Sequence, residues 1–162
     1  VHNAGAPPQA ADSVGHGSAD RGRWHQRFDT NVAGAVTVIE AFLPRRRGSE
    51  AGRSVNVSST MGSLVERANP DSPYYAMVVP AYQSSKAALN SITIGLSKKL
   101  ADTDIKVTSV CPGFVQTDLT PINREQAPRT ADQAAQVVLT AATLPADAAS
   151  GTFIDRDGPV AW

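Results

Sequence analysis

Three stretches of the chain repeat apolar residues at every third or fourth position, which is the pattern of one buried helix face. They cover residues 24–44, 81–100 and 130–144. The third opens with Thr130 and Gln133 at capping-box spacing. The pattern therefore predicts three helices. The apolar face of the first is formed by Trp24, Phe28, Val32, Val36, Ile39 and Leu43, and that of the second by Ala88, Leu89, Ile92, Leu96 and Leu100.

Short β-prone segments alternate with these helices. They span residues 55–58, 105–111 and 152–155, and the chain itself begins with what resembles the end of a strand. This alternation favours an α/β fold with a parallel sheet and right-handed crossovers. Ligands of such sheets bind at the carboxyl ends of the strands. Polar residues, glycines and prolines occur at the ends of the predicted strands. We expect loops in the segments 7–22, 60–80 and 114–129.

Composition narrows the function classes. The chain has 162 residues, enough for one domain with a core. Its 15 basic and 15 acidic residues cancel, which gives no support for nucleic acid or an anionic membrane as a partner. No apolar run reaches the length of a membrane span, and no signal segment opens the chain. The single cysteine, Cys111, cannot form an internal disulfide, so we expect a cytoplasmic protein.

Tyr82 and Lys86 are the candidate reactive pair. Residues four apart on a helix share a face, so the ammonium of Lys86 would lie beside the phenol of Tyr82. A free tyrosine has a pKa of about 10, and a neighbouring positive charge lowers it. Such a phenol can donate a proton to a carbonyl oxygen or accept one from an alcohol. Taken alone, the spacing also fits a surface tyrosine beside a surface lysine.

The motifs around this pair resemble those of one known family. A strand ending in Val55-Asn56-Val57-Ser58-Ser59 precedes Tyr82-Gln83-Ser84-Ser85-Lys86, and a strand ending in Pro112-Gly113 follows it. Together with His2-Asn3-Ala4-Gly5, they resemble the short-chain dehydrogenase/reductase family over essentially the whole chain. The resemblance implies an α/β fold that is the C-terminal part of a Rossmann-type doubly wound parallel sheet. Residues 1–162 would form a partial NAD(P)-binding domain, with strands four to seven and no second domain.

The resemblance also implies catalytic roles. Tyr82 would be the acid/base, and Lys86 would lower its pKa and bind the nicotinamide ribose. Ser59 would hydrogen-bond the reacting oxygen, with Ser58 as the competing choice. Asn31 would hold a water that links Lys86 to bulk solvent.

A nicotinamide cofactor is implied in the same way. Asn3, Ala4 and Gly5 would lie along the cofactor, and the backbone of Val115 would hold the carboxamide. The resemblance implies no metal. The spacing from Ser59 to Tyr82 and the segment 151–158 resemble the carbonyl-reductase-like bacterial branch, which favours NADP over NAD. The full set of expected cofactor-binding residues is Asn3, Ala4, Gly5, Tyr82, Lys86, Pro112, Gly113, Val115 and Thr117.

The implied function is an NAD(P)-dependent oxidoreductase that interconverts a small-molecule carbonyl and an alcohol by hydride transfer. Helices 24–44 and 81–100 resemble the family's dimer-forming pair, so we expect a homodimer or homotetramer. The family's phosphate-binding glycine loop is absent, and its place would be upstream of Val1. We therefore expect the N-terminal third to be missing and this chain alone to be inactive. The alternative is a non-catalytic truncated remnant that serves only as a dimerising or ligand-binding module.

Overall fold

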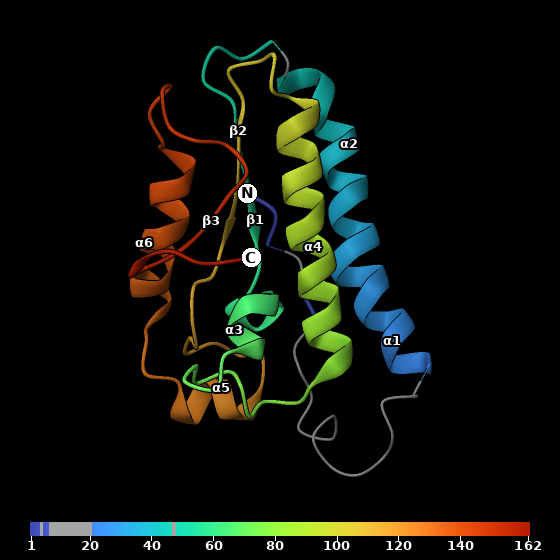
Figure 1. The fold of residues 1–162 in the computed structure, drawn as a ribbon, viewed down its shortest axis with the longest axis vertical. Coiled ribbons are helices and arrows are strands. Elements are labelled where there is room, and N and C mark those ends of the chain that lie inside the picture. The colour runs from blue at the N-terminus through green and yellow to red at the C-terminus, as the bar shows by residue number, and fades with distance from the viewer. Residues whose placement is uncertain (4, 7–20, 47) are drawn as a thin grey trace.

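The computed structural model describes residues 1–3, 5–6, 21–46 and 48–162. A four-stranded sheet of order β1-β2-β3-β4 forms its centre (Figure 1). Strands β1 (Arg53–Val57), β2 (Lys106–Val110) and β3 (Thr152–Asp155) are parallel, and β4 (Gly158–Pro159) is antiparallel to β3. On the free edge of β1, His2 forms a parallel bridge to Asn56. The predicted α/β class and parallel sheet are confirmed.

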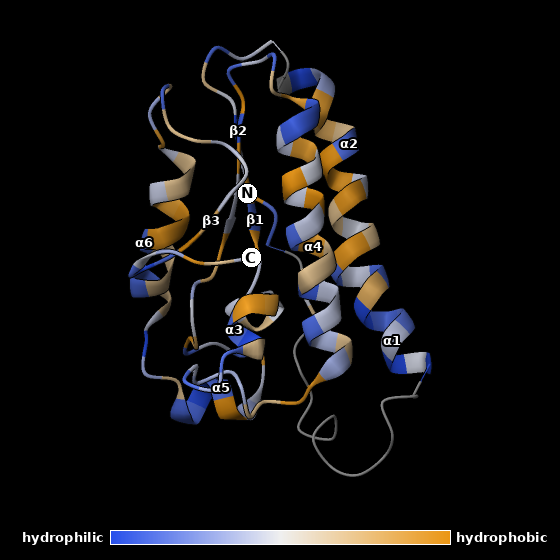
Figure 2. Cartoon of the chain, viewed as in Figure 1, coloured by the Kyte–Doolittle hydropathy of each residue, from blue (hydrophilic) through white to orange (hydrophobic). Residues whose placement is uncertain are grey.

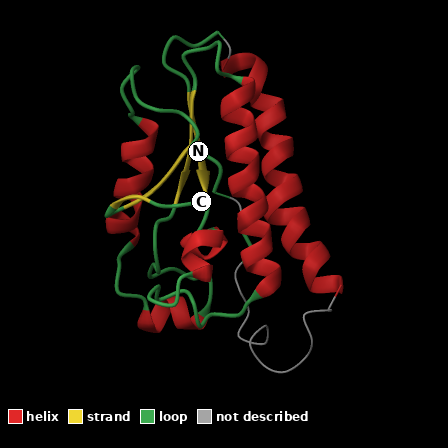
Figure 3. Ribbon diagram, viewed as in Figure 1, coloured by secondary structure: helices red, strands yellow, loops and turns green. Residues whose placement is uncertain are grey.

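Helices cover both faces of this sheet (Figures 1 and 3). One layer contains α1 (Arg21–Phe28), the π-helical turn η2 (Asp29–Ala33), α2 (Gly34–Arg46) and α4 (Pro80–Lys99), and the other contains α6 (Ala131–Ala142). Apolar residues concentrate in α2 and the adjoining part of α4, whereas α1 is mostly hydrophilic (Figure 2). Helix α4 begins with Pro80 at its first position, and the predicted Thr130–Gln133 capping box opens α6.

Two apolar clusters hold these layers together. On one face, residues of α2 and α4 pack on β2; on the other, α6 packs on β1 and β2. The strand residues alternate between the two faces, as expected for a sheet covered on both sides. The first cluster consists of Ile39, Leu96, Leu100, Ile105 and Val107, and the second of Val55, Val57, Val110, Val137 and Ala141.

Some predicted boundaries are wrong. Segment 60–80 contains the 3-10 turn η3 (Thr60–Gly62) and helix α3 (Leu64–Ala68), and segment 114–129 contains α5 (Pro121–Gln126). The first helix does not end at Pro44 but continues to Arg46. A proline lacks the backbone donor for the bond to residue i−4, and this loss destabilises α2 without ending it.

Candidate active site

A cavity of about 890 Å³ opens at the carboxyl ends of β1 and β2. This is where the sheet topology predicted a ligand site. Nearly all of the predicted site residues line this cavity; Ala4 lies outside the described residues, and Asn31 is buried beside the cavity wall rather than in it. The predicted residues that line it are Asn3, Gly5, Ser59, Tyr82, Lys86, Pro112, Gly113, Val115 and Thr117.

The two serines after β1 have different surroundings. The Ser58 hydroxyl donates to Oδ1 of Asn90 at 2.6 Å and is buried against α4. Ser59 is partly exposed, caps η3 by accepting from the amide of Met61 at 3.2 Å, and hydrogen-bonds the phenol of Tyr82. The geometry therefore favours Ser59 over Ser58 as the serine that meets a reacting oxygen.

Tyr82 and Lys86 lie one turn apart in α4, as their spacing predicted. The Lys86 Nζ atom is 5.8 Å from the centre of the Tyr82 ring. It donates a hydrogen bond of 2.9 Å to the carbonyl oxygen of Val57. The lysine is 4% exposed, so its ammonium is held between α4 and the end of β1.

Burial dominates the acid–base properties of this pair. Burial raises the pKa of Tyr82 to about 12, although the Ser59 hydrogen bond and, to a smaller extent, the charge of Arg27 lower it. Burial likewise lowers the pKa of Lys86 to about 8. The pKa of Tyr82 is therefore raised on balance, because its removal from water outweighs the effects that lower it, and the expected lowering by Lys86 stays a prediction.

Asn31 lies in the π-helical turn between α1 and α2. π-Turns within helices occur frequently at functional sites. The side chain of Asn31 is fully buried, donates to Oγ of Ser85 at 2.9 Å and accepts from the amide of Ala6 at 2.6 Å. It thus joins α4 to the segment that follows His2. The structure holds Asn31 next to the reactive helix face, and its expected role toward a water stays a prediction.

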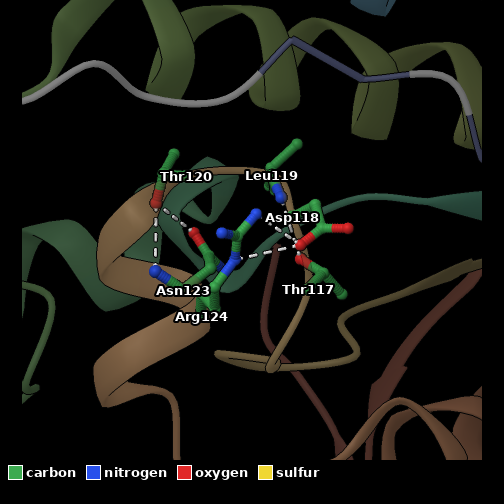
Figure 4. A network of polar contacts seen from close by, with 6 residues as sticks. All are labelled: Thr117, Asp118, Leu119, Thr120, Asn123 and Arg124. Atoms are coloured by element: carbon green, nitrogen blue, oxygen red, sulfur yellow. Dashed lines mark hydrogen bonds and ion pairs between the residues drawn. The ribbon is translucent and has the colours of Figure 1, made fainter.

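The segment after β2 is fixed by hydrogen bonds rather than by a regular element. Asn123 of α5 donates from Nδ2 to the carbonyl oxygen of Val115 at 3.0 Å. Gly113 has φ +84°, where glycine is favoured, and its Cα faces the guanidinium of Arg129. Figure 4 shows how the same segment continues into α5 through contacts among Thr117, Asp118, Leu119, Thr120, Asn123 and Arg124.

The residues of the cavity fit the nicotinamide end of a cofactor. An ammonium has three donors, and among the described residues Lys86 uses one of them, on Val57. A Cβ atom at Gly5 would lie 3.7 Å from the Lys86 Nζ atom, so a bare Cα leaves space beside this cation. Spare donors next to an open backbone suit the hydroxyls of a ribose.

Three further residues shape the site and were missed in the sequence. Arg27 is buried on α1 one turn before Asn31, close enough for its charge to act on Tyr82. Gln83 accepts from the amide of Val79 and donates to the carbonyl oxygen of Met77, which fixes the start of α4. Gly62 packs directly on the backbone of α4. Spacing could have revealed Arg27, which precedes Asn31 by four; the other two depend on tertiary contacts.

Known proteins share these features. The sequence pattern described as short chain dehydrogenase matches residues 1–128. The chain belongs to the short-chain dehydrogenase family. It is 34% identical over 161 residues to sulfoacetaldehyde reductase 2 of Chromohalobacter salexigens, an alignment that covers 90% of this chain and 58% of that protein. The chain spans about half the length of the curated relatives that it matches.

Solved structures of dehydrogenases from this family have the same fold. Carbonyl reductase Sniffer of D. melanogaster superposes with a TM-score of 0.78 at 28% identity, covering 99% of this chain and 64% of Sniffer. A 3-oxoacyl-[acyl-carrier protein] reductase of Brucella melitensis with bound NAD gives a TM-score of 0.72 at 25% identity, covering 96% and 58%. The predicted family and Rossmann-type fold are therefore confirmed.

The described part of this chain lacks two other kinds of feature. It contains no group of three or more His, Cys, Asp or Glu side chains arranged to hold a metal ion. None of its helices is long and apolar enough to cross a membrane.

Proposed function

We propose that this protein is an NAD(P)-dependent oxidoreductase that interconverts a small-molecule carbonyl and an alcohol. One observation carries the proposal. The Ser59 hydroxyl, the Tyr82 phenol and the Lys86 ammonium converge on one wall of the cavity, with the serine hydrogen-bonded to the phenol. A neutral hydroxyl pair beside a buried cation is suited to hold a carbonyl oxygen and to give it a proton.

The chain's own residues supply the proton chemistry. A phenol with a pKa of about 12 is protonated at neutral pH, so Tyr82 is ready to act as the acid in carbonyl reduction. Ser59 donates a second hydrogen bond to the same oxygen and stabilises its developing charge. In alcohol oxidation the phenolate form of Tyr82, which the hydrogen bond from Ser59 stabilises, accepts the proton and becomes the neutral phenol.

The proposed cofactor is a nicotinamide dinucleotide, NADP more than NAD. When bound, it supplies or accepts the hydride. The spare donors of Lys86 would hold the ribose hydroxyls, and the amide of Val115 would meet the carboxamide, since its carbonyl oxygen is already occupied by Asn123. Gly5, Pro112, Gly113 and Thr117 line the same cavity and complete the proposed cofactor site, and Asn3 would lie against the adenosine side of the cofactor. A relative named as a reductase and a similar structure with bound NAD support a nicotinamide cofactor, and the preference for NADP rests on the resemblance to the carbonyl-reductase-like branch.

Further parts of the proposal rest on the family. We expect a homodimer or homotetramer, and a cytoplasmic location because the chain has a single cysteine. The rival function, a non-catalytic module that only dimerises or binds a ligand, is disfavoured by the serine–phenol hydrogen bond, which such a module does not need.

The test is Tyr82→Phe in the full-length protein, which keeps the ring and removes the proton. With NADPH or NADH and a panel of small aldehydes and ketones, kcat should fall by a factor of about 10² to 10⁴. Cofactor affinity, followed by fluorescence titration, should stay unchanged. Tyr75→Phe, at an exposed tyrosine, is the matched control and should keep full activity. Near wild-type turnover in Tyr82→Phe would refute the proposal.

A further inference from the structure

Turn η3 makes an unusually close contact with helix α4 at Gly62. A Cβ atom built on Gly62 would lie 2.7 Å from the carbonyl carbon of Lys86, 2.8 Å from the amide nitrogen of Ala87 and 2.8 Å from the Lys86 Cβ atom. Two of these three atoms belong to the helix backbone and cannot turn away. Ordinary van der Waals contact begins at about 3.4 Å. Any side chain at this position therefore has to push the turn and the helix apart.

The requirement at Gly62 is one of space and not of backbone conformation. Among the described residues, the glycines with positive φ are Gly113, Gly151 and Gly158, so Gly62 has dihedral angles that alanine adopts without strain. The main effect of an added methyl group is thus displacement. To reach 3.4 Å from 2.7 Å, the two backbones must separate by about 0.7 Å.

This displacement would reach Ser59 directly. The amide of Gly62 donates to the carbonyl oxygen of Ser59 at 2.8 Å, and the Ser59 hydroxyl caps the same turn. The other side of the contact is the peptide between Lys86 and Ala87, one helical turn from Tyr82. The contact therefore lies between the two elements that carry the serine and the phenol.

We infer that Gly62 is a positioning residue of the active site, whose bare Cα sets the separation of the Ser59 hydroxyl from the Tyr82 phenol. The inference rests on the proposed function. Errors of about 1 Å in the placement of reacting groups cost about 10²-fold in rate, so a shift of about 0.7 Å is large enough to matter. The charged or titratable groups around the phenol are Lys86 on its own helix, Cys111 at the end of β2 and Arg27 on α1. Lys86 is itself part of the contact with Gly62, whereas Cys111 and Arg27 belong to other segments.

The test compares Gly62→Ala with Gly48→Ala in the full-length protein. Gly48 is exposed, and a Cβ atom there meets nothing within 4 Å. Gly62→Ala should lower kcat by a factor of about 10 to 10² with little change in cofactor affinity, and Gly48→Ala should not. Loss of the Ser59 hydrogen bond also raises the phenol pKa, so the pH profile of alcohol oxidation should move upward by about one unit. A loss of folded protein would lower the rate without moving this profile.

A double-mutant cycle shows whether the effect passes through Ser59. In the Ser59→Ala background, Gly62→Ala should change kcat by less than about twofold. Each variant is also prepared with Pro44→Ala, which removes an exposed proline from α2 and should raise stability. Three results would each overturn the inference. The first is an unchanged kcat and pH profile in Gly62→Ala, and the second is a loss of kcat that adds to that of Ser59→Ala. The third is failure of Gly62→Ala to fold both with Pro44 and with Pro44→Ala. If Tyr82→Phe stays active, the proposed function itself fails, which is a separate outcome.

Discussion

Replacing Lys86 by methionine removes one buried charge and leaves a side chain of similar length in place. Burial lowers the pKa of Lys86 from 10.5 to about 8. This shift means that burying the protonated amine lowers the free energy of unfolding by about 3 kcal/mol. The hydrogen bond to Val57 that disappears offsets about 1–2 kcal/mol of the gain. At pH 7 the variant should therefore be inactive and yet more stable than wild type by about 1–2 kcal/mol.

The same charge gives stability a pH dependence of defined sign. The pKa of Lys86 is lower in the folded protein, so the unfolded chain binds more protons, and wild-type stability rises between about pH 8 and pH 10. Tyr82 acts in the opposite sense above about pH 10, because its pKa is raised to about 12 in the folded protein. The methionine variant should lack the rise between about pH 8 and pH 10.

Urea unfolding of wild type and Lys86→Met across this range measures both effects. Lys98→Met is the matched control, because Lys98 is exposed near the end of the same helix. Its stability should differ from wild type by less than about 0.5 kcal/mol at every pH. If Lys86→Met is less stable than wild type at pH 7, the ammonium contributes more through its contacts than its burial costs, and the reasoning is refuted.

Three other substitutions test separate parts of the structure. Ser59→Ala should lower kcat by a factor of about 10² to 10³. Ser58→Ala should leave kcat unchanged and lower the free energy of unfolding by about 1–2 kcal/mol, because the buried hydrogen bond to Asn90 is lost. A loss of kcat in Ser58→Ala but not in Ser59→Ala would exchange the roles of the two serines. Asn123→Asp replaces the amide that donates to Val115 by a carboxylate, and should weaken NADPH binding by about 5- to 10-fold in a fluorescence titration with kcat retained. Pro44→Ala restores a backbone donor inside α2 and should raise stability by about 1–3 kcal/mol; an unchanged melting temperature would count against this.

Periodicity was enough to predict the elements that carry the reactive groups. The four-residue spacing of Tyr82 and Lys86 placed both on one face of α4, and the polar ends of two strands marked the cavity. The short helices were missed although both carry local signals. Ser63 caps α3 by accepting from Glu66, and Thr120 precedes Pro121 at the start of α5. With 5 and 6 residues, α3 and α5 are too short to show the apolar periodicity that marks the longer helices.

Other features had no local signal. Alternation along β1 indicates which residues face α4 but does not distinguish a hydroxyl bound to Asn90 from one bound to Tyr82. The π-helical turn that holds Asn31 interrupts a stretch whose apolar spacing predicted one continuous helix. The upward shift of the Tyr82 pKa also had no signal in the sequence, because spacing reveals a neighbouring charge and says nothing of burial.

The two opposite pKa shifts together determine how a proton moves in this site. Both favour the neutral group, so at neutral pH the phenol of Tyr82 keeps its proton, while the ammonium of Lys86 is within about one unit of losing its own. In the proposed carbonyl reduction the phenol would become a phenolate, and the Ser59 hydrogen bond and the positive charge of Arg27 would stabilise its charge. Because the pKa of the ammonium lies below that of the phenol, proton transfer from Lys86 back to Tyr82 is favourable. On the proposed function, burial of the lysine costs stability and lets its ammonium return the proton that restores the acid, so Lys86→Met should be more stable than wild type and inactive.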